Sequence, residues 1–209
     1  MATNYEKMEL AARALFLQSD QQAAIARWDL RHDGDYLYFH LFSQPVKLDR
    51  RTAELLPDGP WDYPLESTVN ESMAVFDLLT LSPRRPRAKG TWSSISGLGG
   101  VIGAGHDRTL SHEGDAARFA GHPEALARAC RRLGGTPETK ADVGFAIPVF
   151  ADFRILFQFW DGDEEFPAQI KYLFDENALQ YMHYETLWYV MGAAMSRLTC
   201  YYRQEQGLR

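Results

Sequence analysis

Cysteine is scarce in this sequence: Cys130 and Cys200 are the only two among 209 residues. Two thiols do not make a disulfide framework, nor the four-cysteine shell of an iron–sulfur cluster, so we expect reduced thiols and a cytoplasmic setting. The N-terminus has no basic leader followed by an apolar run, which predicts no signal peptide. No stretch approaches the roughly 18 apolar residues of a membrane span. These absences argue against secreted and membrane-spanning classes of protein.

Basic residues are also in short supply. The 22 Lys and Arg stand against 28 Asp and Glu, which gives a formal net charge of −6. General nucleic-acid binders and proteins attracted to anionic membranes need a basic surface, so we expect neither partner. The composition is 45% hydrophobic, 13% aromatic and 24% charged, as in ordinary globular proteins. We therefore predict one folded domain over residues 1–209, with a helical N-terminal segment over 1–28.

Helix signals recur along the chain. Two capping-box pairs, Ser19 with Gln22 and Thr68 with Glu71, are typical of helix starts because they satisfy backbone N–H groups that lack helical partners. Proline in the first turn of 122–133 and a glycine pair after it mark both ends of that helix. The expected helices cover residues 4–17, 19–28, 68–80, 122–133, 176–181 and 184–204.

Apolar stripes indicate which helix faces are buried. The first helix has Met8, Ala11, Ala12 and Leu15 at helical spacing, which predicts that this stripe packs inward. The last helix has the longest stripe. Its members are Leu187, Met191, Ala194, Met195 and Leu198.

Strand signals fall in two groups, 36–49 and 143–174. Aromatic and β-branched runs over 36–42, 143–150, 153–160 and 169–174, separated by turn residues, predict hairpins. We expect residues 57–64 to form a loop and 91–121 to be mostly loop or irregular strand. The predicted fold class is α+β, with a mostly antiparallel sheet built from both hairpins and covered by the 68–80, 122–133 and 184–204 helices.

One part of the chain resembles a known family. The motif Trp160-Asp-Gly-Asp-Glu-Glu-Phe-Pro167 is followed by Leu173-Phe-Asp-Glu-Asn-Ala178 and then by Tyr181 and Glu185. With Leu133-Gly-Gly135, Gly144 and Pro148 upstream, these residues are similar to domain of unknown function family 3786, an uncharacterised family of bacteria and archaea. The resemblance is strongest over 130–198 and extends weakly back to about residue 30.

The resemblance carries expectations about metabolism rather than chemistry. Members of the family occur mainly in anaerobes, and similar domains are fused to part of a corrinoid iron–sulfur protein. This implies a role in tetrapyrrole or one-carbon metabolism, with a corrinoid-type protein as partner. It transfers no catalytic residue to this chain, and the absence of a multi-cysteine motif weakens the idea that the chain holds an iron–sulfur centre itself.

The acidic run after Trp160 is the sharpest candidate for a ligand site. Asp161, Asp163 and Glu165 (with Glu164) stand on a tight turn, where carboxylates can bind a hard cation or act as a general base. Alternatively, Asp161 and Gly162 make the turn and the other acids are solvated.

Two further carboxylates belong to the same hypothesis. If Asp175 and Glu185 converge with Asp163 and Glu165, the chain has an acidic pocket. Alternatively, Asp175 and Glu185 only cap and flank the helices that follow them.

The glycine-rich stretch 96–106 fits neither phosphate-binding pattern, because Ile102 stands where the dinucleotide fingerprint needs glycine and no Gly-Lys-Ser/Thr follows. It can serve as a lid or as a plain loop. His106 and His112 are candidate ligands for a metal or for an axial position of a tetrapyrrole, or else ordinary surface histidines. Arg84, Arg85, Arg87 and Lys89 form a basic run that either clamps an anion or is a solvated connection.

Three functions stay open at this level. The first is a module that binds a small ligand or cofactor, or serves as an accessory module, with its pocket between the glycine-rich stretch and the acidic hairpin. The second is a carboxylate- or metal-dependent enzyme that uses residues 161–165. The third is a structural or oligomerisation domain whose contact surface includes the Met- and Tyr-rich final helix. The sequence identifies no cofactor, metal or reaction.

Overall fold

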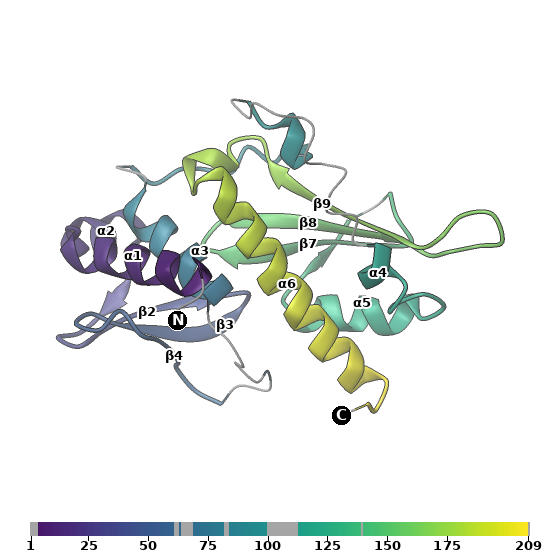
Figure 1. Cartoon of the computed structure of the whole chain (residues 1–209), viewed down its shortest axis with the longest axis horizontal. Coiled ribbons are helices and arrows are strands. Elements are labelled where there is room, and N and C mark those ends of the chain that lie inside the picture. Colours follow the sequence, from purple (N-terminus) through teal and green to yellow (C-terminus); the bar gives the residue numbers. More distant parts are fainter. Residues whose placement is uncertain are drawn as a thin grey trace.

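The computed structural model describes residues 4–60, 63, 69–81, 84–99, 113–138 and 140–208. Figure 1 shows α1 and α2 beside a small sheet at one end of the molecule and a larger sheet with a long hairpin at the other. The helices are α1 (Asn4–Gln18), α2 (Gln21–Trp28), α3 (Val69–Thr80), α4 (Glu113–Ala116), α5 (Pro123–Arg132) and α6 (Tyr184–Glu205), with 3-10 helices at Ile95–Gly97 and Ala178–Gln180. The α+β class is confirmed.

The strands form two antiparallel sheets. The first has the order β1 (Arg31–His32), β2 (Tyr36–Leu41), β3 (Gln44–Asp49) and β4 (Leu55–Pro57). The second has the order β5 (Trp92–Ser93), β9 (Gln169–Asp175), β8 (Phe153–Trp160), β7 (Val143–Phe150) and β6 (Thr136–Pro137).

The two predicted hairpins therefore lie in separate sheets rather than in one. The junction between the sheets gives the reason. After β2, Phe42 and Ser43 both adopt left-handed backbone conformations (φ 51° and 62°) and turn the chain back into β3. The N–H of Phe42 donates to the carbonyl of Val149 in β7, at 2.9 Å. Because the chain turns at this point, β2 and β7 belong to different sheets. They contact each other through the packing of Phe39 on Phe150 and through this hydrogen bond just after β2.

A continuous cluster of buried apolar side chains spans both sheets and the helices on them. Along β8, Phe153, Ile155 and Phe157 face the core as predicted, and Arg154 is exposed. Gln158, expected on the same outer face as Arg154, is only 6% exposed. Both faces of β8 are therefore covered over part of its length, which an alternating pattern alone does not reveal.

The burial of α1 differs from the expected stripe. Phe16 is fully buried and stacks on Phe76 of α3, with ring centroids 5.8 Å apart. Met8 is 45% exposed and Leu15 is 59% exposed, and Ala11 also faces solvent. Of the predicted stripe only Ala12 packs against the core. The prediction was wrong for Met8, Ala11 and Leu15, because the side of α1 that carries Phe16 faces α3.

The capping-box predictions need correction. The residue before α2 is Asp20, whose carboxylate accepts a hydrogen bond from the N–H of Ala23 at 3.0 Å. The hydroxyl of Ser19 instead donates to the carbonyl of Phe16. Glu71 is buried and pairs with Arg197 of α6 at 3.2 Å, and its expected partner Thr68 lies outside the described residues. The predicted helix 176–181 is reduced to the 3-10 turn Ala178–Gln180.

Two glycines of the family-like motif are required by close packing. Gly134 ends α5 in a left-handed conformation (φ +74°), and a Cβ there would meet Oγ of Ser43 at 2.1 Å. A Cβ on Gly144 would lie 2.6 Å from the carbonyl oxygen of Glu138. Both glycines thus have a structural role in joining α5 and β7 to their neighbours.

Candidate functional site

The acidic hairpin between β8 and β9 projects from the end of the second sheet (Figure 1). Its conformation is held by Asp163, whose Oδ1 accepts hydrogen bonds from the N–H groups of Glu165 and Phe166, both at 2.8 Å. The N–H of Asp163 in turn donates to the carbonyl of Phe166. These backbone donors hold the pKa of the Asp163 carboxyl below its usual value. Asp163 is therefore a turn-forming residue.

Asp161 also binds backbone. Its two carboxylate oxygens accept from the N–H of Gly121, at 3.0 and 3.1 Å, and its own N–H donates to the carboxylate of Asp142. The base of the hairpin is thereby attached to the segment that precedes α5. Glu165 is exposed. The turn is therefore closed by Asp163 and not by the pair Asp161 and Gly162, and Asp161 binds the segment before α5 instead of being solvated. Ligand binding by the run stays a prediction.

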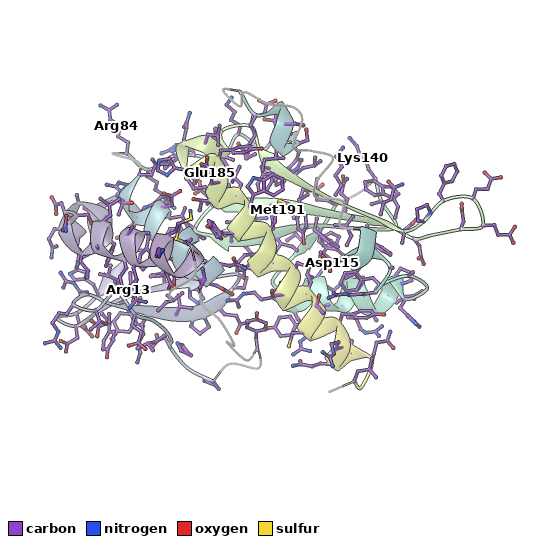
Figure 2. All side chains as sticks on the ribbon, viewed as in Figure 1. Arg13, Arg84, Asp115, Lys140, Glu185 and Met191 are labelled. Atoms are coloured by element: carbon purple, nitrogen blue, oxygen red, sulfur yellow. The ribbon has the colours of Figure 1, made fainter. Side chains whose placement is uncertain are left out.

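Asp175 lies at the other end of β9. The ladder places Gln169 opposite Trp160 at the hairpin end, and Asp175 opposite Trp92 at the far end. Gln169 and Asp175 are six steps of about 3.3 Å apart along the strand, so the hairpin tip lies about 20 Å or more from Asp175. Figure 2 shows Glu185 at the start of α6, away from the hairpin. The expectation that these carboxylates converge in one acidic pocket is wrong.

Asp175 and its neighbours order the basic loop 84–90 instead. Asp175 is 2% exposed, and its Oδ2 accepts from the N–H of Gly90 at 2.7 Å. Nδ2 of Asn177 donates to the carbonyl of Arg87, and Lys89 pairs with Glu176 at 3.6 Å. The carboxylates at this end of β9 therefore bind the loop's backbone and one of its cations.

The basic side chains of this loop are exposed, and Arg84 extends into solvent in Figure 2. Arg85 places its guanidinium carbon 5.7 Å from the ring of Trp28. Beneath them, Tyr181 is fully buried, and burial, followed by the nearby Asp152 carboxylate, raises the pKa of its phenol. Tyr181 was predicted only as part of the family-like motif. Asp152 was not predicted as a site residue, because no motif marks the β7–β8 turn that carries it.

No group of three or more His, Cys, Asp or Glu able to hold a metal occurs within the part of the chain that the structure describes. The candidates His106 and His112 lie outside that part, as does most of the glycine-rich stretch. The pocket expected between that stretch and the hairpin therefore has only one described wall. Metal or tetrapyrrole binding by the two histidines stays a prediction.

A cleft of about 450 Å³ lies where the two sheets meet, and sequence reasoning did not find it. Trp28, Phe39 and Phe150 form its aromatic floor. The ring of Phe150 lies 5.0 Å from that of Trp28 and 5.4 Å from that of Phe39. Residues from α2, the first sheet and the β7–β8 turn line it. They are Trp28, Asp29, Leu30, Arg31, Tyr38, Phe39, His40, Pro45, Asp58, Phe150 and Ala151.

The rim of this cleft is polar. The guanidinium of Arg31 lies 3.8 Å from the centre of the Tyr38 ring and pairs with Asp58 at 2.8 Å. Asp29 and Ala151, both in left-handed conformations (φ 52° and 50°), bring their segments to the opening. An aromatic floor with a few polar groups at the mouth is the usual composition of a small-molecule site.

A second cavity, of about 480 Å³, lies at the base of the acidic hairpin. Its lining joins aromatic and apolar surface to one carboxylate and one ammonium group. The residues are Trp160, Asp161, Phe166, Pro167, Gln169, Ile170 and Lys171. Several residues of the family-like motif line this cavity.

Comparison with known proteins gives one family. The model of the family described as Domain of unknown function (DUF3786) matches residues 20–197. No curated protein matches, and no solved structure matches. Among the described residues, no helix is long and apolar enough to cross a membrane.

Proposed function

The chain belongs to domain of unknown function family 3786, and we propose that it is a cytoplasmic module that binds a small ligand or cofactor in the cleft between its two sheets. The observation that carries this proposal is the aromatic floor of the cleft, formed by Trp28, Phe39 and Phe150. Flat rings stack on such surfaces in offset or edge-to-face arrangements. The cytoplasmic setting is supported by the free thiols of Cys130 and Cys200.

The size of the cleft narrows the ligand class. Small-molecule sites usually have volumes of about 300–1,000 Å³, and about 450 Å³ lies in the lower part of that range. This volume favours a compact planar molecule over a complete macrocycle. The family suggests a role in anaerobic or one-carbon metabolism. We therefore propose that any corrinoid is bound by a partner protein that this chain contacts, and not by the cleft itself.

Two neighbouring tyrosines of β2 allow a matched test. Tyr38 lines the cleft, and Tyr36 does not, although both are half-buried and each lies under a cation. We expect Tyr38→Ala to weaken ligand binding about fivefold, because it removes roughly 1 kcal/mol of stacking. Tyr36→Ala is expected to leave the affinity unchanged.

The measurement is a two-dimensional NMR titration of the full chain with nicotinate, adenosine and riboflavin as probes. At least one probe should shift the indole resonance of Trp28 and the amide of Phe39 saturably. Thermal melting of both variants controls for the bond between the Tyr38 hydroxyl and Asp33, which Tyr38→Ala also removes. The proposal would be contradicted by resonance shifts confined to residues outside the cleft, or by equal losses of affinity in the two variants.

A second candidate function, self-association, is favoured by α1. Among the described residues, four of the six exposed large apolar side chains belong to this helix, namely Met8, Leu10, Leu15 and Leu17. They form two pairs, Met8 with Leu15 and Leu10 with Leu17, because residues seven apart share one face of a helix. Exposed apolar surface of this kind often marks a protein contact. The final helix does not offer such a surface, since Met191 and Met195 are buried. We propose α1 in its place as the contact surface of a homo-oligomer.

Light scattering tests this candidate. We expect the wild-type chain to be a dimer or larger and the Leu10→Gln/Leu17→Gln double variant to be a monomer, because each change places a polar amide where the interface would be dry. Leu208→Gln, which alters an exposed leucine near the C-terminus, should leave the oligomeric state as it was. A monomeric wild type would remove this function.

A further inference from the structure

The tip of the β8–β9 hairpin presents an aromatic side chain on a fixed backbone. Phe166 is 62% exposed, more than any other large apolar side chain in the described part of the chain. Its N–H and carbonyl both bind Asp163, so its backbone position is fixed before any partner arrives. Exposed aromatic residues on ordered projections are frequent anchors in protein interfaces, because little conformational entropy is lost when they bind.

The cavity next to Phe166 has walls suited to a cation. Trp160, Phe166, Pro167 and Ile170 supply the apolar lining. The faces of tryptophan and phenylalanine rings carry negative potential and attract ammonium and guanidinium groups. Aliphatic surface beside them accommodates the methylene stem of a long basic side chain.

The charges around the cavity have one dominant sign. Asp161 is part of the lining, and the N–H of Gly121 holds its carboxylate in place. Asp163, Glu164 and Glu165 add three exposed carboxylates on the adjoining turn. Lys171 is the one cation in the lining. The field at the mouth therefore attracts positive groups and repels anions.

We propose that this cavity receives an arginine side chain from an exposed basic segment of a partner protein, with Phe166 as the aromatic anchor of the same interface. Arginine fits better than lysine because its planar guanidinium can stack on the rings while it donates hydrogen bonds to Asp161. The proposal does not depend on the cleft between the sheets. It concerns a second surface, at the opposite end of β9 from the basic loop 84–90.

The probe is the pentapeptide acetyl-Gly-Gly-Arg-Gly-Gly-amide, titrated into the full chain and followed by NMR. The matched peptide carries citrulline, which has nearly the same shape as arginine and no charge. We expect the arginine peptide to shift the Trp160 indole and the Phe166 amide saturably, with an affinity at least about tenfold above that of the citrulline peptide. A lysine peptide should fall between them.

Variants of the lining sharpen the test. Phe166→Ala and Asp161→Asn should each weaken the arginine peptide about fivefold. Lys171→Gln should strengthen it, because it removes the opposing cation, and a local loss of structure would not produce a gain. Glu138→Gln, which alters an exposed acid outside the hairpin, serves as the control and should have no effect.

Three outcomes would overturn the proposal. One is equal binding of the arginine and citrulline peptides, and another is a set of shifts outside residues 160–171. The third is a wild-type oligomer that Arg85→Gln dissociates, because the occupant would then be the basic loop of a second copy and not a partner protein. Weakening of the arginine peptide by added salt would support the proposal.

Discussion

Replacing Arg197 by alanine is expected to lower the free energy of unfolding by about 3–5 kcal/mol, because it leaves a buried carboxylate without its partner. Arg197 is fully buried in α6, and Glu71 of α3 is 2% exposed. Their side chains meet at 3.2 Å. The Arg197 guanidinium carbon also lies 5.1 Å from the ring of Phe42 and 4.7 Å from that of Tyr63.

The pH dependence of this variant follows from Glu71. Burial raises the pKa of this carboxyl in the folded chain, although Arg197 opposes the shift. Without Arg197 the pKa of Glu71 in the folded chain rises further, while its pKa in the unfolded chain stays at about 4.3. The folded state then binds the proton more tightly than the unfolded state does. Stability of Arg197→Ala should be greatest below the unfolded pKa and should fall as the pH rises through the folded pKa.

Urea denaturation of the wild type, of Arg197→Ala and of a double variant measures both the loss of stability and its pH dependence. The double variant Glu71→Gln/Arg197→Ala has the same truncation as Arg197→Ala but carries no buried charge at this site, so it should retain more stability than Arg197→Ala and should lack the added pH dependence. If the single and double variants lose equal stability at neutral pH, the loss comes from side-chain volume and the account based on an unpaired charge is wrong.

Replacing Trp28 by alanine is the second large effect, with an expected loss of about 3–5 kcal/mol, as for other buried aromatic side chains. Trp28 is 4% exposed at the end of α2. Its ring lies 5.0 Å from that of Phe150 and 6.1 Å from that of Tyr181. Its indole N–H donates to the carbonyl of Leu78 in α3 at 2.9 Å. One side chain thus joins α2, α3 and the second sheet.

Trp28→Phe separates the contribution of apolar packing from that of the indole hydrogen bond. Phenylalanine keeps much of the apolar contact but leaves the carbonyl of Leu78 without this donor, so we expect an intermediate loss of about 1–3 kcal/mol. The stability of both variants can be measured by thermal or urea unfolding, followed by circular dichroism. Because Trp28 is also part of the cleft floor, Trp28→Phe should additionally alter probe shifts there. Equal stability losses in the two variants would show that the hydrogen bond dominates.

Local patterns predicted most of the elements. The strands over 143–150 and 153–160 were confirmed at their predicted bounds. The start of α5 at Pro123 and the buried stripe of α6 were also confirmed. These features depend on interactions within a few residues along the chain, such as proline in a first turn and apolar repeats. The family was likewise recognisable from one motif, Trp160 to Pro167.

Other predictions depended on contacts between distant segments and could not be made from local patterns. Glu71 has the spacing of a helix cap, yet it pairs with Arg197 from a helix far along the chain. Most of the aliphatic stripe of α1 faces solvent because Phe16 docks on Phe76. In both cases a partner distant in sequence outweighs a local preference of a few tenths to about 1 kcal/mol.

The sequence by itself determined the class of fold, the family and the acidic turn after Trp160, because these follow from composition, spacing and residues near one another in the chain. Only the tertiary structure decided that Asp163, in the hairpin before β9, lies far from Asp175 at the other end of that strand. It also decided that Trp28, Phe39 and Phe150 line one cleft. A carboxylate in a motif looks the same whether it caps a backbone N–H or faces a ligand, and the way the strands pair decides between the two.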